Sequence, residues 1–363
     1  MSEPPDDAEL ARLGFYDPSA PGADDMREVL RTVFELGATI DEVAEAGGWR
    51  LGPLALDLAM RPPGPTLDLA TFAETAGVDP ALVRSIWAAL GLPDSGPVRV
   101  TPDAAEAMNL LVGMSAWFQP DTTLALARVM GSSCARLAEA LANAFRVELE
   151  VPERKRGTTY TNAINSSVLT GRDLLPLFLQ ALNAIFRRHL ILVSYNLWST
   201  DEEDAVVTVR RVVGFADLVS STEAVLGGSV RTLARKVREF EELVWDLVTR
   251  VEGRVVKLIG DEAMFVIEDA GAACEVALRP VETSPQRIRV GLAYGTVAAL
   301  YGDYYGETVN LAARLVGIAE PSTVIVSDEV CRRADARFSF DALPEKELKG
   351  FGDPVVSYRA GRR

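Results

Sequence analysis

The sequence is poor in the residues that build metal clusters and disulfide frameworks. It contains three cysteines, Cys134, Cys274 and Cys331, and one histidine, His189, among 363 residues. The cysteines are odd in number, lie far apart and show no CxxC or Cys/His spacing, so we expect neither a zinc site nor a set of disulfides. Free thiols fit a reducing compartment, and we expect the protein to be cytoplasmic.

Long apolar runs and an excess of positive charge are also missing. The most apolar segment, 174–186, has thirteen uncharged residues, whereas a membrane-spanning helix needs about 18 or more. The acidic start, MSEPPDDAEL, lacks the features of a signal peptide, so we expect no stable membrane insertion. The formal net charge of −15 argues against a general nucleic-acid surface. An anionic substrate would therefore need a locally positive pocket or metal ions.

The N-terminal half has the periodicity of helices. Its helix formers carry apolar residues at three- and four-residue spacing, which predicts helices over 26–46, 68–76, 80–90, 104–118 and 123–150. The polar, basic stretch 151–162 is expected to be a connection. One or two amphipathic helices are expected over 173–198, and the acidic residues 201–204 are expected to be a linker.

One helical pair in this half has the pattern of a DNA-binding motif. The helix, Gly77 turn and helix over residues 66–92 resemble a helix-turn-helix of the MerR type. A DNA reader needs cations for the phosphates and base-reading polar groups on its second helix. This stretch sets three acidic residues against a single cation, Arg84. We favour a pair used for packing and keep a transcription factor as an alternative, which a salt-dependent DNA-binding assay would test.

The pattern changes near residue 205. The β-branched stretch 205–218 and the two apolar runs around the Gly-Asp turn of 253–267 predict strands. Further strands are expected over 287–297 and 322–327, and helices over 229–251, 270–278, 306–318 and 328–334. The order β-α-β-β-α-β indicates a ferredoxin-like α+β fold. That fold hosts many functions, so the site must decide the activity.

Two carboxylates follow apolar strands. Asp217 ends the first strand, and Asp261 lies at the turn of the central hairpin. Because the first strand of a ferredoxin-like sheet lies beside that hairpin, we expect the two carboxylates to come together. Such a pair suits two divalent cations about 4 Å apart, which polarise a phosphoryl group and activate an attacking oxygen. The structural alternatives are a helix cap at Asp217 and a turn former at Asp261.

Two further groups of polar residues are spaced for phosphate and sugar binding. Ser221 and Thr222 stand where a helix begins, and backbone N–H groups at such a position can hold phosphate oxygens. Asn310 and Arg314 are four residues apart and therefore share one helix face. An Asn beside an Arg can hold a sugar and neutralise a phosphate. A solvated polar face is the alternative.

Four stretches together resemble the catalytic domain of class III adenylyl cyclases, over about residues 206–359. They are FADLVSST, VVKLIGDEAMFV, GDYYGETVNLAARL and ELKGFGDPVVSYR, in the order of the family. The resemblance implies that Asp217 and Asp261 bind two divalent cations, Mg²⁺ or Mn²⁺. It also implies that backbone amides of Ser221 and Thr222 hold the terminal phosphates of ATP.

The remaining site residues are implied by the same resemblance. Lys257 and Asp303 match the adenine-selecting pair, in which a lysine donates to a ring nitrogen and an aspartate accepts from the exocyclic amine. Guanine presents a carbonyl there, which leaves buried polar groups unpaired. Asn310 and Arg314 match the pair that orients the ribose and stabilises the charged transition state. Lys349 is expected at the triphosphate.

Related nucleotide-cyclising families fit less well. The stretch LIGDEAM nearly spells the GGDEF signature of enzymes that join two GTP molecules, but Ile259 replaces the first glycine. That family also lacks the Lys/Asp and Asn/Arg pairs found here. Guanylyl cyclases of class III carry Glu and Cys, or similar residues, at the base-reading positions. The resemblance therefore implies an adenylyl cyclase that converts ATP to 3′,5′-cyclic AMP and pyrophosphate.

The resemblance also implies an assembly and a domain plan. In the family, the metal aspartates and the Asn/Arg pair of one site come from different subunits, so a homodimer with two composite sites is expected. A nucleotide-binding pseudo-cyclase is the alternative, against which the intact metal and Asn/Arg positions speak. We expect a helical regulatory domain over 1–172, connecting helices and a linker over 173–204, and a catalytic domain over 205–363.

The helical half resembles the regulatory domain of autoinhibited, pH-responsive mycobacterial class III adenylyl cyclases. His189, just before the catalytic domain, can change charge near neutral pH and is the expected regulatory residue. A surface histidine beside two arginines is the alternative. We expect the apolar segment 174–186 to pack in a core. A dimer seam or a pocket for a lipid ligand are the other interpretations.

Overall fold

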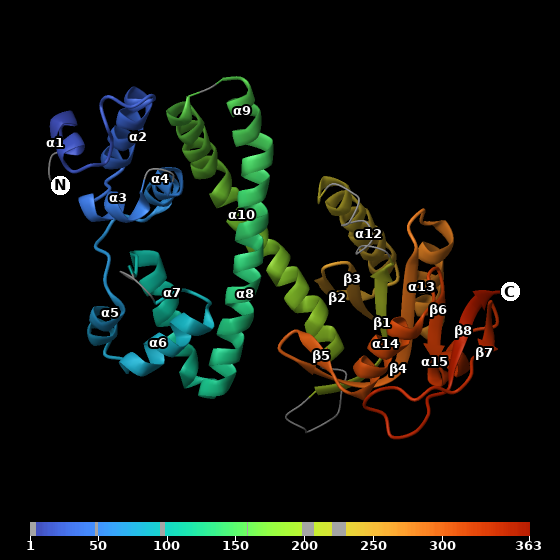
Figure 1. Ribbon diagram of the computed structural model, residues 1–363. Coiled ribbons are helices and arrows are strands. Elements are labelled where there is room, and N and C mark those ends of the chain that lie inside the picture. Colours follow the sequence, from blue (N-terminus) through green and yellow to red (C-terminus); the bar gives the residue numbers. More distant parts are fainter. Residues whose placement is uncertain (1–4, 48–49, 95–98, 158, 198–206, 220–229) are drawn as a thin grey trace. The chain divides into compact units, whose positions relative to one another are not determined.

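The computed structural model describes residues 5–47, 50–94, 99–157, 159–197, 207–219 and 230–363. The chain divides into two compact units, residues 1–192 and 193–363, and each is described by itself (Figure 1). In the described part of the chain, none of the helices has both the length and the apolarity needed to cross a membrane.

The N-terminal unit is helical, as predicted. Its helices are α1 (Asp7–Arg12), α2 (Ala23–Glu35), α3 (Ile40–Ala46), α4 (Leu51–Met60), α5 (Leu69–Ala76), α6 (Pro80–Ala89), α7 (Pro102–Gly113), α8 (Pro120–Phe145), α9 (Val151–Lys155) and α10 (Tyr160–Leu197). The single helix predicted over 26–46 is two helices. Gly37 follows α2 with φ +98°, and a capping box between Thr39 and Glu42 begins α3.

The helix-turn-helix pattern forms a packed pair. Gly77 ends α5 in the left-handed conformation, and the side chain of Asp68 caps the start of α5. The second helix, α6, buries Val83, Ile86 and Trp87 in an apolar core that it shares with α5 and α7. One face of α6 therefore packs in this core, as the packing interpretation expects.

Helix α10 differs most from the prediction. It is continuous from Tyr160 to Leu197, so the domain boundary expected at 172/173 falls inside it. Its first turns enter the core of the N-terminal unit through Ile164 and Val168. The expectation that segment 174–186 packs in a core is wrong, because none of its side chains is buried in the single chain. Leu177, for example, is 61% exposed and Phe186 is 64% exposed.

The C-terminal unit is built on one eight-stranded sheet. Its elements are β1 (Val207–Leu218), α12 (Val230–Arg250), β2 (Arg254–Ile259), β3 (Glu262–Ile267), α13 (Ala270–Thr283), β4 (Ile288–Leu300), β5 (Asp303–Tyr305), α14 (Glu307–Ile318), β6 (Val324–Ser327), α15 (Asp328–Arg333), β7 (Phe338–Ala342) and β8 (Ser357–Arg362). The strand order is β2-β3-β1-β4-β6-β8-β7, and β5 pairs with β4.

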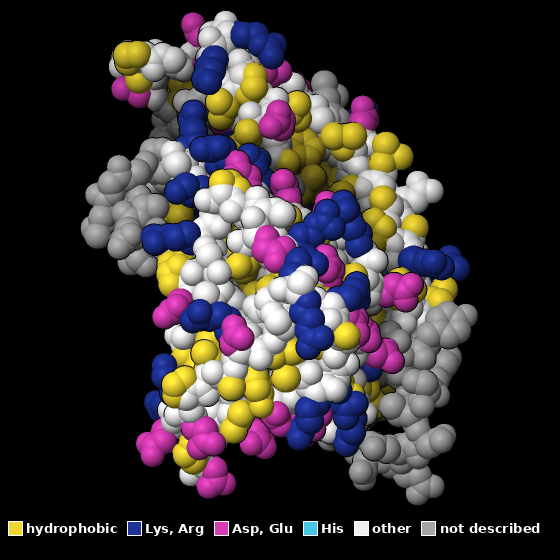
Figure 2. Space-filling model, turned by 90° about the vertical axis from the view of Figure 1, so that its right-hand side faces the viewer, with side chains coloured by type: hydrophobic (Ala, Val, Ile, Leu, Met, Phe, Trp, Pro, Cys, Tyr) yellow, Lys and Arg dark blue, Asp and Glu magenta, His cyan; other side chains and the backbone are white. Residues whose placement is uncertain are grey.

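The centre of this sheet confirms the predicted α+β fold. Strands β2, β3, β1 and β4 pair antiparallel in the ferredoxin-like order. Strands β5, β7 and β8 were not predicted. On the face shown in Figure 2, the described Lys and Arg side chains are interspersed with Asp and Glu.

The two faces of the sheet carry different cores. Residues Val212 and Ala216 of β1 belong to the core under α12 and α13. Their neighbours Val213 and Phe215 belong to the core under α14. Because strand side chains alternate between faces, Asp217 is on the α14 face, together with the residues opposite it in the register.

Candidate active site

The end of β1 and the β2–β3 turn lie side by side. The backbone N–H of Leu218 donates to the carbonyl of Asp261 at 3.0 Å, and Asp217 stands opposite Glu262 in the antiparallel register. Gly260 has φ +66°, which the tight turn requires and which a glycine adopts without strain. The structure thus brings Asp217 and Asp261 to one edge of the sheet, as the sequence predicted.

Arg289 is a site residue that the sequence reasoning missed. It stands opposite Asp217 on β4, and its guanidinium donates from Nε to Oδ2 of Asp217 at 2.6 Å. A second nitrogen lies 2.5 Å from the same oxygen. Only the cross-strand register could have revealed this pair, since the two residues are 72 positions apart. The ion pair orients the carboxylate of Asp217.

Glu262 adds a third carboxylate to this edge. Burial raises the pKa of Glu262, and the negative charges of Asp217 and Asp261 raise it further, while Arg289 offsets part of the effect. The part of this shift that Asp217 and Asp261 contribute reflects a local excess of negative charge around the turn. A divalent cation would relieve it, because carboxylate oxygens are the ligands that hard cations prefer.

The donor set fits a divalent cation held partly by its substrate. Within the described ranges, no three Asp, Glu, His or Cys side chains stand in a metal-binding arrangement. Two aspartates alone would leave most coordination positions open. Mg²⁺ commonly binds in this way, through one or two carboxylates, waters and substrate phosphates. The residues predicted to hold the phosphates, Ser221 and Thr222, lie outside the described residues.

The predicted base-reading pair is assembled. Nζ of Lys257 on β2 donates to Oδ2 of Asp303 on β5 at 2.6 Å. The other carboxylate oxygen of Asp303 accepts the backbone N–H of Tyr304 at 2.8 Å. The side chains are 34% and 26% exposed, so the pair is partly shielded and still within reach of a ligand.

The predicted ribose and transition-state pair stands on an exposed face of α14. This helix buries Thr308, Ala312, Leu315 and Val316. Asn310 and Arg314 lie on its exposed side, as their four-residue spacing predicts. The Nε of Arg314 donates to the backbone carbonyl of Lys349 at 3.3 Å, which brings the exposed Lys349 next to α14 although 35 residues separate the two.

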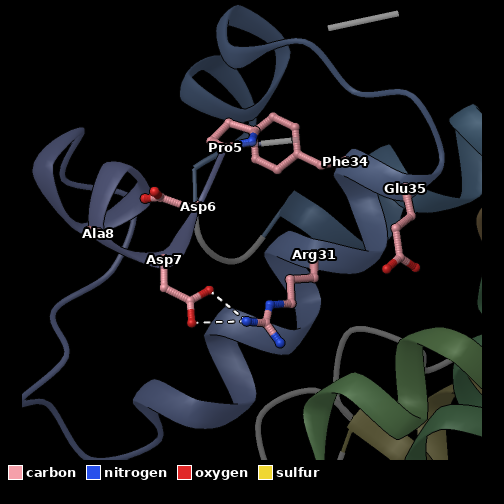
Figure 3. Close-up of a pocket in the computed structure, with 7 residues that line it drawn as sticks. All are labelled: Pro5, Asp6, Asp7, Ala8, Arg31, Phe34 and Glu35. Carbon is pink, nitrogen blue, oxygen red and sulfur yellow. Dashed lines mark hydrogen bonds and ion pairs between the residues drawn. The ribbon is translucent and has the colours of Figure 1, made fainter. Parts of the chain in front are cut away.

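The predicted regulatory residue and a surface pocket both lie in the N-terminal unit. His189 is exposed on α10, and its role stays a prediction. The pocket in Figure 3 is lined by Pro5, Asp6, Asp7, Ala8, Arg31, Phe34 and Glu35. Its cation is already paired, because Arg31 donates to both carboxylate oxygens of Asp7 at 2.9 Å. No predicted site residue lines this pocket.

Comparison with known proteins identifies the family. Residues 200–359 match the adenylate and guanylate cyclase catalytic domain. An adenylate cyclase of Streptomyces coelicolor is 34% identical over 276 residues, which are 73% of this chain and 71% of that protein. An uncharacterized protein of Mycobacterium tuberculosis is 33% identical over 336 residues, 89% of this chain and 87% of that protein.

A pH-sensitive adenylate cyclase of Mycobacterium tuberculosis is also similar, with 27% identity over 355 residues, 92% of this chain and 87% of that protein. Domains of the matched family bind nucleotides, use divalent metal ions and commonly work as dimers. The positions of Asp217 and Asp261 at one end of the sheet and the Lys257–Asp303 contact are consistent with this family. The chain therefore belongs to the class III adenylate cyclases.

Proposed function

We propose that the protein converts ATP to 3′,5′-cyclic AMP and pyrophosphate. The observation that supports ATP over GTP is the contact between Lys257 and Asp303 at 2.6 Å. Because Nζ has three protons, Lys257 can bind Asp303 and still donate to a purine ring nitrogen. Asp303 can accept from the exocyclic amine of adenine, whereas the carbonyl of guanine would face its carboxylate with no proton between them.

The reaction would be an in-line phosphoryl transfer within one nucleotide. The ribose 3′-oxygen bonds to the α-phosphorus, the bond to pyrophosphate breaks, and the hydroxyl proton passes to solvent water. Asp217 and Asp261 would hold two divalent cations, Mg²⁺ or Mn²⁺, which when bound lower the pKa of the hydroxyl and screen the phosphate charge. Asn310 would orient the ribose, and Arg314 would offset the negative charge that develops in the transition state. No side chain is assigned as general base.

We infer that two chains form two composite sites. In the single chain, Asp217 pairs with Arg289, while Arg314 bonds to the Lys349 backbone. The exposure of Asn310 and Arg314 leaves them available to a second copy. Each site would then combine the aspartates of one chain with α14 of the other.

A mixing experiment tests the composite site. Asp261→Ala and Arg314→Ala should each be inactive alone, and their co-expression should restore about a quarter of wild-type activity, because half of the dimers then carry one intact site. Co-expressed Asp217→Ala and Asp261→Ala are the matched control. Both remove the same half of the site, so their mixture should stay inactive. Equal activity in the two mixtures would contradict the composite arrangement.

The cyclase reaction itself is tested with the purified protein, Mn²⁺, and ATP or GTP. Cyclic AMP from ATP, lost in Asp261→Ala, is the expected result. Cyclic GMP as the main product would refute the assignment of Lys257 and Asp303. No product from a folded dimer, with or without its N-terminal half, would favour a pseudo-cyclase.

We further propose that the N-terminal unit, called the helical unit, restrains the C-terminal unit, called the catalytic unit, and responds to pH. Similarity to a pH-sensitive adenylate cyclase over 92% of this chain supports this proposal. Higher activity of the catalytic unit alone than of the whole chain is the expected result.

The exposed apolar side chains of α10 are proposed as a dimer seam. The lipid ligand stays a prediction from the sequence.

A further inference from the structure

We propose that Arg254 is a positioning residue for base selection, because it holds the hairpin that presents Asp303 to the purine. This inference rests on the proposed function. Arg254 is exposed at the start of β2, and it has no place among the residues expected to touch the nucleotide. Its contacts instead reach the two residues that flank Asp303 in the chain.

The position of Asp303 depends on a tight turn. Leu300 and Asp303 are partners in the β4–β5 hairpin, so the loop between them is the dipeptide Tyr301-Gly302. Both residues have positive φ, +49° and +80°, as in the type I′ turn that suits a two-residue hairpin. Glycine adopts this conformation freely, but a bulky residue such as Tyr301 does so only where its surroundings hold it.

Arg254, on strand β2, contacts this turn and stabilises it. Its guanidinium donates to the carbonyl of Gly302 at 2.7 Å, and the same group lies 5.8 Å from the ring centroid of Tyr304. These contacts fix the residue before Asp303 and the residue after it. The hydrogen bond is charge-assisted, which strengthens it and sharpens its geometry, and the ring contact adds a cation–π attraction.

An irregularity in β2 makes this arrangement possible. Arg254 stands opposite Val266 and Lys257 opposite Met264, with a register shift between 255 and 257. Residues three apart on a regular strand face opposite sides. The extra residue of the bulge restores both side chains to one face, because their partners are two apart. Lys257 therefore binds the Asp303 carboxylate while Arg254 binds the backbone just before it.

This geometry predicts a selectivity defect. A fixed Asp303 carboxylate weakens the binding of guanine, because the guanine carbonyl would be forced against a negative charge. Without Arg254 the turn loses its anchor, and Asp303 can turn away from a guanine ring. The kcat/KM for GTP should rise relative to that for ATP. The residues proposed to bind the metal and the transition state are unchanged.

The test compares Arg254→Gln, Arg254→Lys and the control Arg250→Gln. Arg250 is an exposed arginine of α12 whose described ion pair is a surface contact to Asp246 at 3.6 Å. We expect Arg254→Gln to lower the ATP-over-GTP ratio of kcat/KM about tenfold, mainly through KM. Arg254→Lys should restore much of the ratio, because its ammonium can still donate to the Gly302 carbonyl. Arg250→Gln should behave as wild type.

Equilibrium binding of ATP and GTP is measured on the same proteins, so that the inference is tested without turnover. A thermal melt shows that each variant is folded. An unchanged ATP-over-GTP ratio in Arg254→Gln, in either assay, would overturn the inference. So would an equal loss for both nucleotides, which indicates a general structural role. A wild type that binds ATP selectively but makes no cyclic AMP would refute the proposed function alone.

Discussion

Replacing Gly291 with alanine should both destabilise the catalytic unit and displace the helix that carries Asn310 and Arg314. Gly291 is on β4, directly under α14. A Cβ added there would lie 2.3 Å from the backbone nitrogen of Val316 and 2.6 Å from the carbonyl oxygen of Ala312. Backbone atoms cannot rotate out of the way as a side chain does. The helix would have to move by about 1 Å to reach ordinary contact distances.

Overpacking of this kind costs about 1–3 kcal/mol. For a urea slope of about 1–3 kcal/mol per molar, the midpoint of unfolding should fall by about 1 M. Cyclic AMP formation should fall more steeply, because a shift of about 1 Å in a positioning element can cost about 100-fold in rate. Urea unfolding and initial rates with ATP measure the two effects.

Gly317→Ala is the matched control. Gly317 lies on the same helix, but its added Cβ would meet no heavy atom within 4 Å. Alanine is favoured over glycine inside a helix by about 0.5–1 kcal/mol, so this variant should keep or raise the midpoint and retain activity. A wild-type midpoint and rate in Gly291→Ala would refute the packing argument.

Three further predictions concern single residues. Burial acts to raise the pKa of Glu42, but the hydrogen bonds from Thr39 and Arg61 outweigh it, so this pKa is lowered overall. Its stabilisation is therefore present above its ordinary pKa of 4.5 and lost as the pH falls through the lowered pKa, so Glu42→Gln should lower the melting temperature at pH 7 more than at pH 3. Asp303→Asn should reduce the ATP-over-GTP preference by about 100-fold, and an unchanged preference in initial rates would contradict the base-reading role. His189→Ala should flatten the pH profile of the whole chain relative to the catalytic unit alone, and an unaltered profile would remove His189 as the sensor.

Much of the catalytic unit could be predicted because its signals are local. Alternating and β-branched stretches indicated the β-α-β-β-α-β order, and a Gly-Asp turn between two apolar strands located Asp261. The four-residue spacing of Asn310 and Arg314 was enough to place them on one face of α14. Strands β7 and β8 were missed, because charged residues and glycine interrupt their short apolar patterns.

What the sequence determined by itself, then, is the order of the elements and the local position of each polar residue, since helix and strand periodicity act over a few neighbouring positions. The tertiary structure decided which of these residues meet. Arg289 reaches Asp217 across 72 positions and Arg254 reaches Gly302 across 48, through strand register and a bulge. The exposure of the apolar side chains of α10 likewise could not be predicted from its composition. Burial depends on what packs against a segment, and that is a property of the folded chain.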